Sequence, residues 1–138
     1  LIRDRGNEYG TTTGRPRRCG WFDAVAVSYS ATIGAIDEIA LLHLDTLTGF
    51  PELKICTAYR IGDEDVTFFP SNLDRLEQAQ PVYESLPGWD QDITGARTFE
   101  DLPEAAQAYV KAIERTCGKP VAVIGIGPKR SQTIIRNA

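Results

Sequence analysis

The chain has 138 residues, of which 42% are hydrophobic and 25% are charged, and its net charge is −4 at pH 7. This composition is typical of one globular domain with a small buried core. Its apolar runs are too short to cross a membrane, and its mild acidity argues against a broad nucleic-acid-binding surface. Neither a membrane nor a nucleic acid is therefore expected as a partner.

The chain begins at Leu1 and contains no methionine. Because translation starts with methionine, we expect either a removed leader or, in preference, a fragment of a longer protein. Cys19, Cys56 and Cys117 lack metal-ligand spacing and are predicted to be reduced thiols of a cytoplasmic protein. With His43 as the single histidine, a protein metal site is not expected.

The first half of the chain alternates between helix and strand signals. Residues 1–20 are polar and predict an extended loop, and the apolar run 21–34 is too long for a strand and predicts a helix buried on most faces. Residues 38–45, "EIALLHLD", are typical of a buried parallel strand. The segments 53–60 and 64–70 predict a hairpin, more exposed than that strand, around the turn "IGDE".

The second half begins irregularly and ends regularly. Residues 71–102 contain prolines and glycines and predict little structure beyond a short helix near 72–78. An apolar stripe predicts a helix over 103–118, with Asp101 as its cap, Pro103 in its first turn and Gly118 at its end.

Two strands are predicted after that helix, a buried one at 120–127 and a short one at 132–136. The order of elements indicates an α/β fold: part of a mainly parallel sheet flanked by helices, with an additional antiparallel hairpin.

The stretch "YGTTTGRPRRCGWFD" places Arg15, Arg17 and Arg18 beside three threonines and Gly14. Arginine presents a planar fork of donors that matches carboxylate and phosphate oxygens, and threonine hydroxyls add further donors. If a helix begins at Trp21, its positive end also lies nearby. The pattern favours a site for a small anion over a solvated basic turn, and it is not a Walker loop.

Two other segments are weaker candidates. Asp45 ends a predicted strand, where α/β folds bind ligands, and its carboxylate could accept two hydrogen bonds from a guanine edge; a cap or turn aspartate is the alternative. "GIGPKR", 125–130, follows another strand and could let a backbone approach a ligand, although a plain turn is the simpler interpretation. We find no complete catalytic set in the sequence.

Four segments together resemble the C-terminal portion of adenylosuccinate synthetase: "GNEYGTTTGRPRRCGWFDAVAV", "LDTLTGFPELKICTAYR", "PVYESLPGW" and "IGPKRSQTII". They cover nearly the whole chain in the family's order. The family joins IMP and L-aspartate into adenylosuccinate in AMP biosynthesis, using GTP as a substrate and Mg²⁺ as a cofactor. The resemblance also implies a homodimer.

The resemblance assigns roles to individual residues. The aspartate and IMP site would comprise Thr11, Thr12, Thr13, Gly14 and Arg15. The GTP site would comprise Arg17 at the phosphates, with His43, Leu44, Asp45, Gly125, Ile126 and Gly127 around the guanine. Two positions depart from the family pattern, since a lysine is usual in place of His43 and a serine is common in place of Gly125.

The family's phosphate loop, its general base, its general acid and its magnesium site lie in the N-terminal portion, which this sequence lacks. Residues 1–138 would therefore be part of one synthetase domain, inactive alone and without catalytic or metal-binding residues of its own. The alternative is a stand-alone nucleotide- or anion-binding module. RNA binding through the basic residues is a third, weaker hypothesis.

Overall fold

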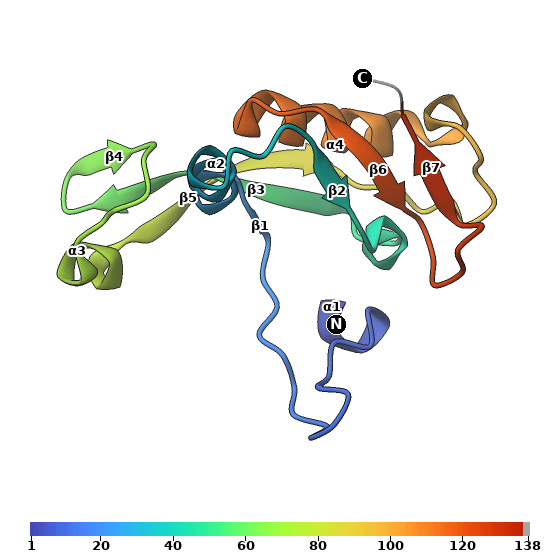
Figure 1. The fold of residues 1–138 in the computed structure, drawn as a ribbon, viewed down its shortest axis with the longest axis horizontal. Coiled ribbons are helices and arrows are strands. Elements are labelled where there is room, and N and C mark those ends of the chain that lie inside the picture. Colours follow the sequence, from blue (N-terminus) through green and yellow to red (C-terminus); the bar gives the residue numbers. More distant parts are fainter. Residues whose placement is uncertain (137–138) are drawn as a thin grey trace.

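The computed structural model describes residues 1–136 as two small sheets with helices packed around them (Figure 1). The elements in chain order are α1 (Ile2–Arg5), β1 (Phe22–Asp23), α2 (Ala24–Ile33), β2 (Ile39–Leu41), the 3₁₀ turn η1 (Leu44–Leu47), β3 (Glu52–Ile61), β4 (Glu64–Val66), α3 (Leu73–Gln78), β5 (Gln80–Pro87), the 3₁₀ turn η2 (Phe99–Asp101), α4 (Glu104–Cys117), β6 (Val121–Gly125) and β7 (Thr133–Ile135).

Both sheets mix parallel and antiparallel pairs, and the α/β class is confirmed. In the first sheet β3 is central, with β1 parallel to it and β4 and β5 antiparallel. In the second sheet β2 runs parallel to β6, and β7 is antiparallel to β6. The predicted hairpin corresponds to β3 and β4. The parallel character expected from the sequence is confined to the β1–β3 and β2–β6 pairs.

Helix α4 is the element that the sequence predicts best. All six residues of its predicted stripe are buried: Leu102, Ala106, Tyr109, Val110, Ile113 and Cys117. Gly118 ends the helix in the left-handed conformation, with φ of 65°, which glycine adopts without a steric penalty.

The predicted cap of α4 is wrong. Asp101 instead closes the preceding η2 turn, where its carboxylate accepts hydrogen bonds from the backbone N–H groups of Arg97 and Thr98. The residue that precedes α4 is Pro103, which has no side-chain cap.

The helix predicted for 21–34 begins later, at Ala24. Phe22 and Asp23 pair with β3, and the Asp23 carboxylate then accepts the backbone N–H of Ala26 and caps α2. The helix is buried along one side only, and Tyr29 and Ile33 are exposed. The expectation of a helix buried on most faces is therefore not met within this chain.

Two predictions about strands are wrong. The strand expected over 38–45 ends at Leu41, and β3 is more buried than β2, with Leu53 and Ile55 fully inaccessible. Strand β5 was predicted as irregular because it contains Pro81 and Pro87. Both prolines are compatible with a strand here because β5 pairs with β3 alone and leaves its other edge outside the ladder.

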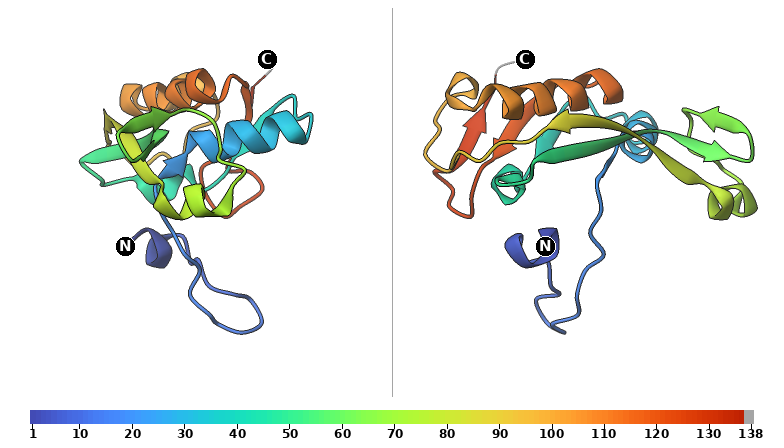
Figure 2. Two further views of the ribbon diagram at one scale, coloured as in Figure 1. Left: turned by 90° about the vertical axis from the view of Figure 1, so that its left-hand side faces the viewer. Right: turned by 180° about the vertical axis from the view of Figure 1, so that it is seen from behind.

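Two parts extend from the packed body. The β3–β5 ribbon continues past α2 and carries β4 and α3 at its far end (Figure 2). On another side, residues 1–20 leave the body at β1, form a long loop and return to place α1 next to η1. This return brings the basic loop and the Asp45 segment into the same region.

Candidate functional site

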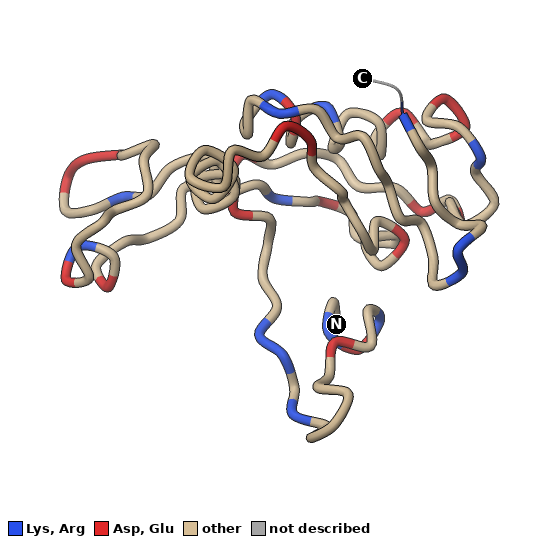
Figure 3. The backbone as a smooth tube through the Cα atoms, in the orientation of Figure 1, with Lys and Arg blue, Asp and Glu red and all other residues tan. Residues whose placement is uncertain are grey.

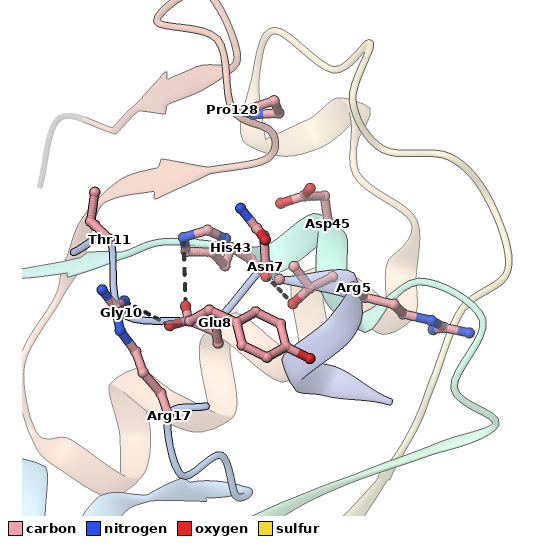
Figure 4. A pocket seen from close by; sticks show the side chains of 12 residues that line it. Arg5, Asn7, Glu8, Gly10, Thr11, Arg17, His43, Asp45 and Pro128 are labelled. Carbon is pink, nitrogen blue, oxygen red and sulfur yellow. Dashed lines mark hydrogen bonds and ion pairs between the residues drawn. The ribbon is translucent and has the colours of Figure 1, made fainter. Parts of the chain in front are cut away.

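A cleft of about 750 Å³ lies between the N-terminal segment, the η1 turn and the turn that follows β6 (Figure 4). Its walls come from three parts of the chain that are far apart in sequence. The lining residues include Arg5, Asn7, Glu8, Tyr9, Thr11 and Arg17 of the first part, His43, Asp45 and Thr46 of the second, and Pro128 of the third.

The η1 turn holds Asp45 against this cleft. His43 adopts the left-handed conformation, with φ of 61°, and its carbonyl oxygen accepts hydrogen bonds from the backbone N–H and the hydroxyl of Thr46. Leu44 is buried in the main core and anchors the turn. The carboxylate between these fixed neighbours therefore has a defined position.

Asp45 carries the one buried side-chain polar atom in the described part of the chain that has no hydrogen-bond partner, its Oδ1. A buried acceptor left unpaired costs about 1–3 kcal/mol. Such an atom beside an open cleft is an acceptor that a donor from outside the chain, a ligand or a water, can pair. A carboxylate suits a donor pair such as the ring N–H and amine of a purine.

Glu8 is the second carboxylate of the cleft. Its Oε2 accepts a hydrogen bond from Arg17 Nη1 at 2.8 Å, and its Oε1 lies 4.0 Å from His43 Nε2. Figure 4 shows Glu8 between these two side chains. Glu8 therefore lies between the Arg17 side chain, with which it forms a hydrogen bond, and the His43 side chain. All three line the cleft that also contains the unpaired oxygen of Asp45.

The threonine–arginine loop is a narrow turn closed by its own backbone. The N–H of Gly10 donates to the carbonyl of Arg15 at 2.8 Å, and the N–H of Gly14 donates to the carbonyl of Gly10 at 2.8 Å. Tyr9 and Pro16 pair in an isolated antiparallel β-bridge. Gly14 has φ of +64°, a conformation that favours glycine. Residues 11–20 are all exposed, and basic segments lie along this loop (Figure 3).

The structure brings only part of the predicted set together. Thr11, Arg17, His43 and Asp45 line the cleft. Outside its lining lie the other predicted loop residues, Thr12, Thr13, Gly14 and Arg15.

The expected contribution of a helix terminus is absent from the described chain. Helix α2 begins at Ala24 rather than Trp21, so its first turn lies well beyond the arginines. One of its N-terminal N–H groups, that of Ala26, also donates to the Asp23 carboxylate. The positive charge of the loop therefore comes from its arginines and not from a helix dipole.

The Gly125–Gly127 segment ends β6 next to the cleft. A Cβ at Gly125 would lie 3.1 Å from Leu42 Cδ2, so a serine would fit after a small shift of that exposed side chain. A Cβ at Gly127 would lie only 2.4 Å from Gln132 Oε1, which accepts the Lys129 backbone N–H. A side chain at position 127 would therefore displace the Gln132 amide and the hydrogen bond that it accepts from Lys129.

Ile126, between these glycines, is fully buried in the main core. It anchors the segment as Leu44 anchors η1, so neither side chain offers a ligand contact in this structure. Their contribution to a site would come from the backbone or from the position of their neighbours.

Sequence reasoning missed the contribution of residues 5–9. Arg5 Nη1 donates to the Thr48 carbonyl and thereby ties α1 to the residue after η1. Asn7, Glu8 and Tyr9 line the cleft. The available signal was an acidic residue, Glu8, close in sequence to Arg3, Arg5 and the arginines of the loop.

No three His, Cys, Asp or Glu side chains within residues 1–136 lie close enough to hold a metal ion. All three cysteines are free thiols; Cys19 is exposed, and burial raises the pKa of Cys56 and Cys117. None of the described helices has the length and apolarity needed to cross a membrane.

The model of the family described as adenylosuccinate synthetase matches residues 1–134. The chain belongs to the adenylosuccinate synthetase family. It is 53% identical over 135 residues to the adenylosuccinate synthetases of Alkaliphilus metalliredigens and Clostridioides difficile.

The structural comparison agrees with the family assignment. A structure of fully ligated adenylosuccinate synthetase from Plasmodium falciparum superposes with a TM-score of 0.93 at 39% identity, over 99% of this chain and 33% of that one. The bacterial matches cover 98% of this chain but 32% of each relative. The adenylosuccinate synthetase segment thus spans about a third of the length of its curated relatives.

Proposed function

We propose that this chain is the C-terminal third of an adenylosuccinate synthetase, a part of one α/β domain in an enzyme of AMP biosynthesis. The parent enzyme would form adenylosuccinate, GDP and phosphate from IMP, L-aspartate and GTP. It would act in the cytoplasm as a homodimer. The family match along residues 1–134 supports the activity of the parent.

The observation that carries the site assignment is the unpaired buried oxygen of Asp45. In the proposal its carboxylate accepts the ring N–H and the exocyclic amine of guanine. His43 and Leu44 precede it in the chain, and Gly125, Ile126 and Gly127 form the adjoining backbone. The position of Gly125 supports this grouping, because a Cβ placed on it would lie 3.4 Å from Leu42 Cα and 3.7 Å from the backbone nitrogen of His43.

The loop would bind the anionic groups of aspartate, IMP and GTP. Thr11, Thr12, Thr13 and Gly14 would hold the carboxylates of aspartate, Arg15 would reach both aspartate and IMP, and Arg17 would approach the GTP phosphates. Arg17 already lines the cleft that contains Asp45. Thr11 also lines this cleft, whereas Thr12, Thr13, Gly14 and Arg15 are exposed and lie outside it, so their role requires walls supplied by the rest of the parent enzyme.

The chain would be inactive alone. The sequence contains no Walker phosphate loop, and His43, its single histidine, faces Glu8. No described cluster fits Mg²⁺, so no step of the proposal passes through a metal held by these residues. Phosphorylation of the IMP 6-oxygen, and displacement of that phosphate by the aspartate amine, would need groups from the N-terminal portion.

The test is the open reading frame that encodes this chain, followed by an assay of its whole product. A frame that extends upstream by roughly twice this length, with GTP-dependent formation of adenylosuccinate, supports the proposal. A frame that extends downstream instead contradicts the C-terminal placement. A full-length product without synthetase activity contradicts the function.

A stand-alone nucleotide-binding module is the second candidate, because the cleft and its unpaired acceptor lie within this chain. It predicts guanine-selective binding by residues 1–138 alone. Titration with GTP and ATP distinguishes the two functions, because the synthetase proposal expects tight binding only in the complete enzyme.

A further inference from the structure

Glu8 occupies a position that the family resemblance leaves without a role. It lies between α1 and the exposed loop, and its side chain is 26% exposed. Its two carboxylate oxygens face different cationic or chargeable groups, Arg17 at 2.8 Å and His43 at 4.0 Å. An acid in the middle of a proposed anion site is unfavourable for binding unless it organises the cations there.

The Arg17 backbone is fixed from two sides. Its N–H donates to the carbonyl of Glu8 at 2.9 Å, and its own carbonyl accepts a hydrogen bond from Arg3 Nε at 2.7 Å. The side chain, by contrast, is 55% exposed. Within residues 1–136 its hydrogen bond to Glu8 is the contact that fixes the direction of the guanidinium.

A guanidinium has five N–H donors in a rigid plane, and Glu8 engages one of its nitrogens. The other donors keep a fixed orientation toward the cleft that both residues line. A long side chain held in this way loses less conformational freedom when an anion binds. Glu8 can therefore improve anion binding although its own charge opposes it.

We propose that Glu8 is a positioning residue, which holds the Arg17 guanidinium at the wall of the cleft so that its free donors meet the phosphates of GTP. This inference rests on the proposed function, because Arg17 is the residue assigned to those phosphates. Glu8 itself makes no contact with a reacting group and is not catalytic.

The experiment uses the full-length parent synthetase with Glu8→Gln, which keeps the side-chain shape and removes the charge. Glu84→Gln is the matched control, because Glu84 accepts hydrogen bonds from Arg115 at 2.6 and 2.8 Å in an exposed pair outside the cleft. We expect Glu8→Gln to lower kcat/KM for GTP about tenfold, as the loss of a charge-assisted positioning contact does. The KM for IMP should change less than about twofold in both variants.

The same substitution in an Arg17→Ala background separates positioning from a structural role. If Glu8 acts through Arg17, Glu8→Gln has no further effect once Arg17 is gone. An equal fall in both backgrounds, or a fall no larger than that of Glu84→Gln, overturns the inference while the synthetase activity stands. An inactive full-length wild type overturns the proposed function, and the inference with it.

Discussion

The phenol of Tyr59 donates a hydrogen bond to Asp23 Oδ2 over 2.5 Å, and the other oxygen of the same carboxylate caps α2. The half-buried Asp23 side chain thus joins the last part of β3 to the first turn of α2. Burial and this carboxylate together raise the pKa of Tyr59 well above its usual value, so the phenol stays a donor. The contact fixes where the basic loop enters the fold.

Removing this contact should destabilise the protein without changing its site. Tyr59→Phe leaves a carboxylate oxygen unpaired and is expected to lower the free energy of unfolding by about 1–2 kcal/mol. Asp23→Ala also removes the helix cap and should cost about 2–3 kcal/mol. Urea unfolding measures both, with Tyr83→Phe at an exposed position of β5 as the control. A loss below about 0.5 kcal/mol for Tyr59→Phe would contradict the interpretation.

Asp45 should determine which base the parent enzyme accepts. Asp45→Asn replaces one acceptor with a donor and can no longer receive both guanine donors. We expect kcat/KM for GTP to fall at least about a hundredfold, because a buried polar mismatch costs several kcal/mol. The kcat/KM for XTP, which carries an oxygen in place of the amine, should fall much less. Steady-state kinetics with both nucleotides tests this, and equal losses for the two would refute the base-reading role.

The chain by itself should self-associate through the groove between α2 and β2. This groove is lined by Ala26, Val27, Ala31, Ile36 and Ile39 among others, and Ile36 is 43% exposed. Apolar grooves of this kind are sites of association, and we expect the rest of the parent enzyme to cover this one.

Ile36→Glu should shift residues 1–138 toward monomer in analytical ultracentrifugation. Leu73→Glu, a change at an equally apolar but isolated position of α3, should not. A wild-type chain that is monomeric at all concentrations would contradict self-association through the groove.

Acid should weaken the turn that precedes α4. The backbone N–H groups of Arg97 and Thr98 lower the pKa of Asp101 below its ordinary value of 3.8. Because the folded state holds this proton less tightly than the unfolded chain, the stabilisation is complete above that value and is lost as the pH falls through the lowered pKa. Asp101→Asn should therefore reduce the urea midpoint near neutral pH and have a smaller effect in strong acid. Asp90→Asn, at an exposed position, serves as the control.

Local signals in the sequence were enough for the elements whose cause is local. The apolar stripe and Gly118 predicted α4, the polar segment with Asn72 at its start predicted α3, and "PVAVIGIG" predicted β6. Each depends on spacing within a few residues, which a single sequence displays. The family likewise followed from contiguous motifs, the longest of them around the threonine–arginine loop.

Tertiary structure decided what depends on partners far along the chain. Strand β5 tolerates its prolines because it pairs with β3 alone, and α2 begins at Ala24 because Asp23 is shared between β1 and the cap. Glu8 meets Arg17 and His43 only because residues 1–20 fold back toward η1. Propensity and periodicity act over a few residues, whereas a cleft forms where distant segments pack, so its lining emerges only from the folded chain.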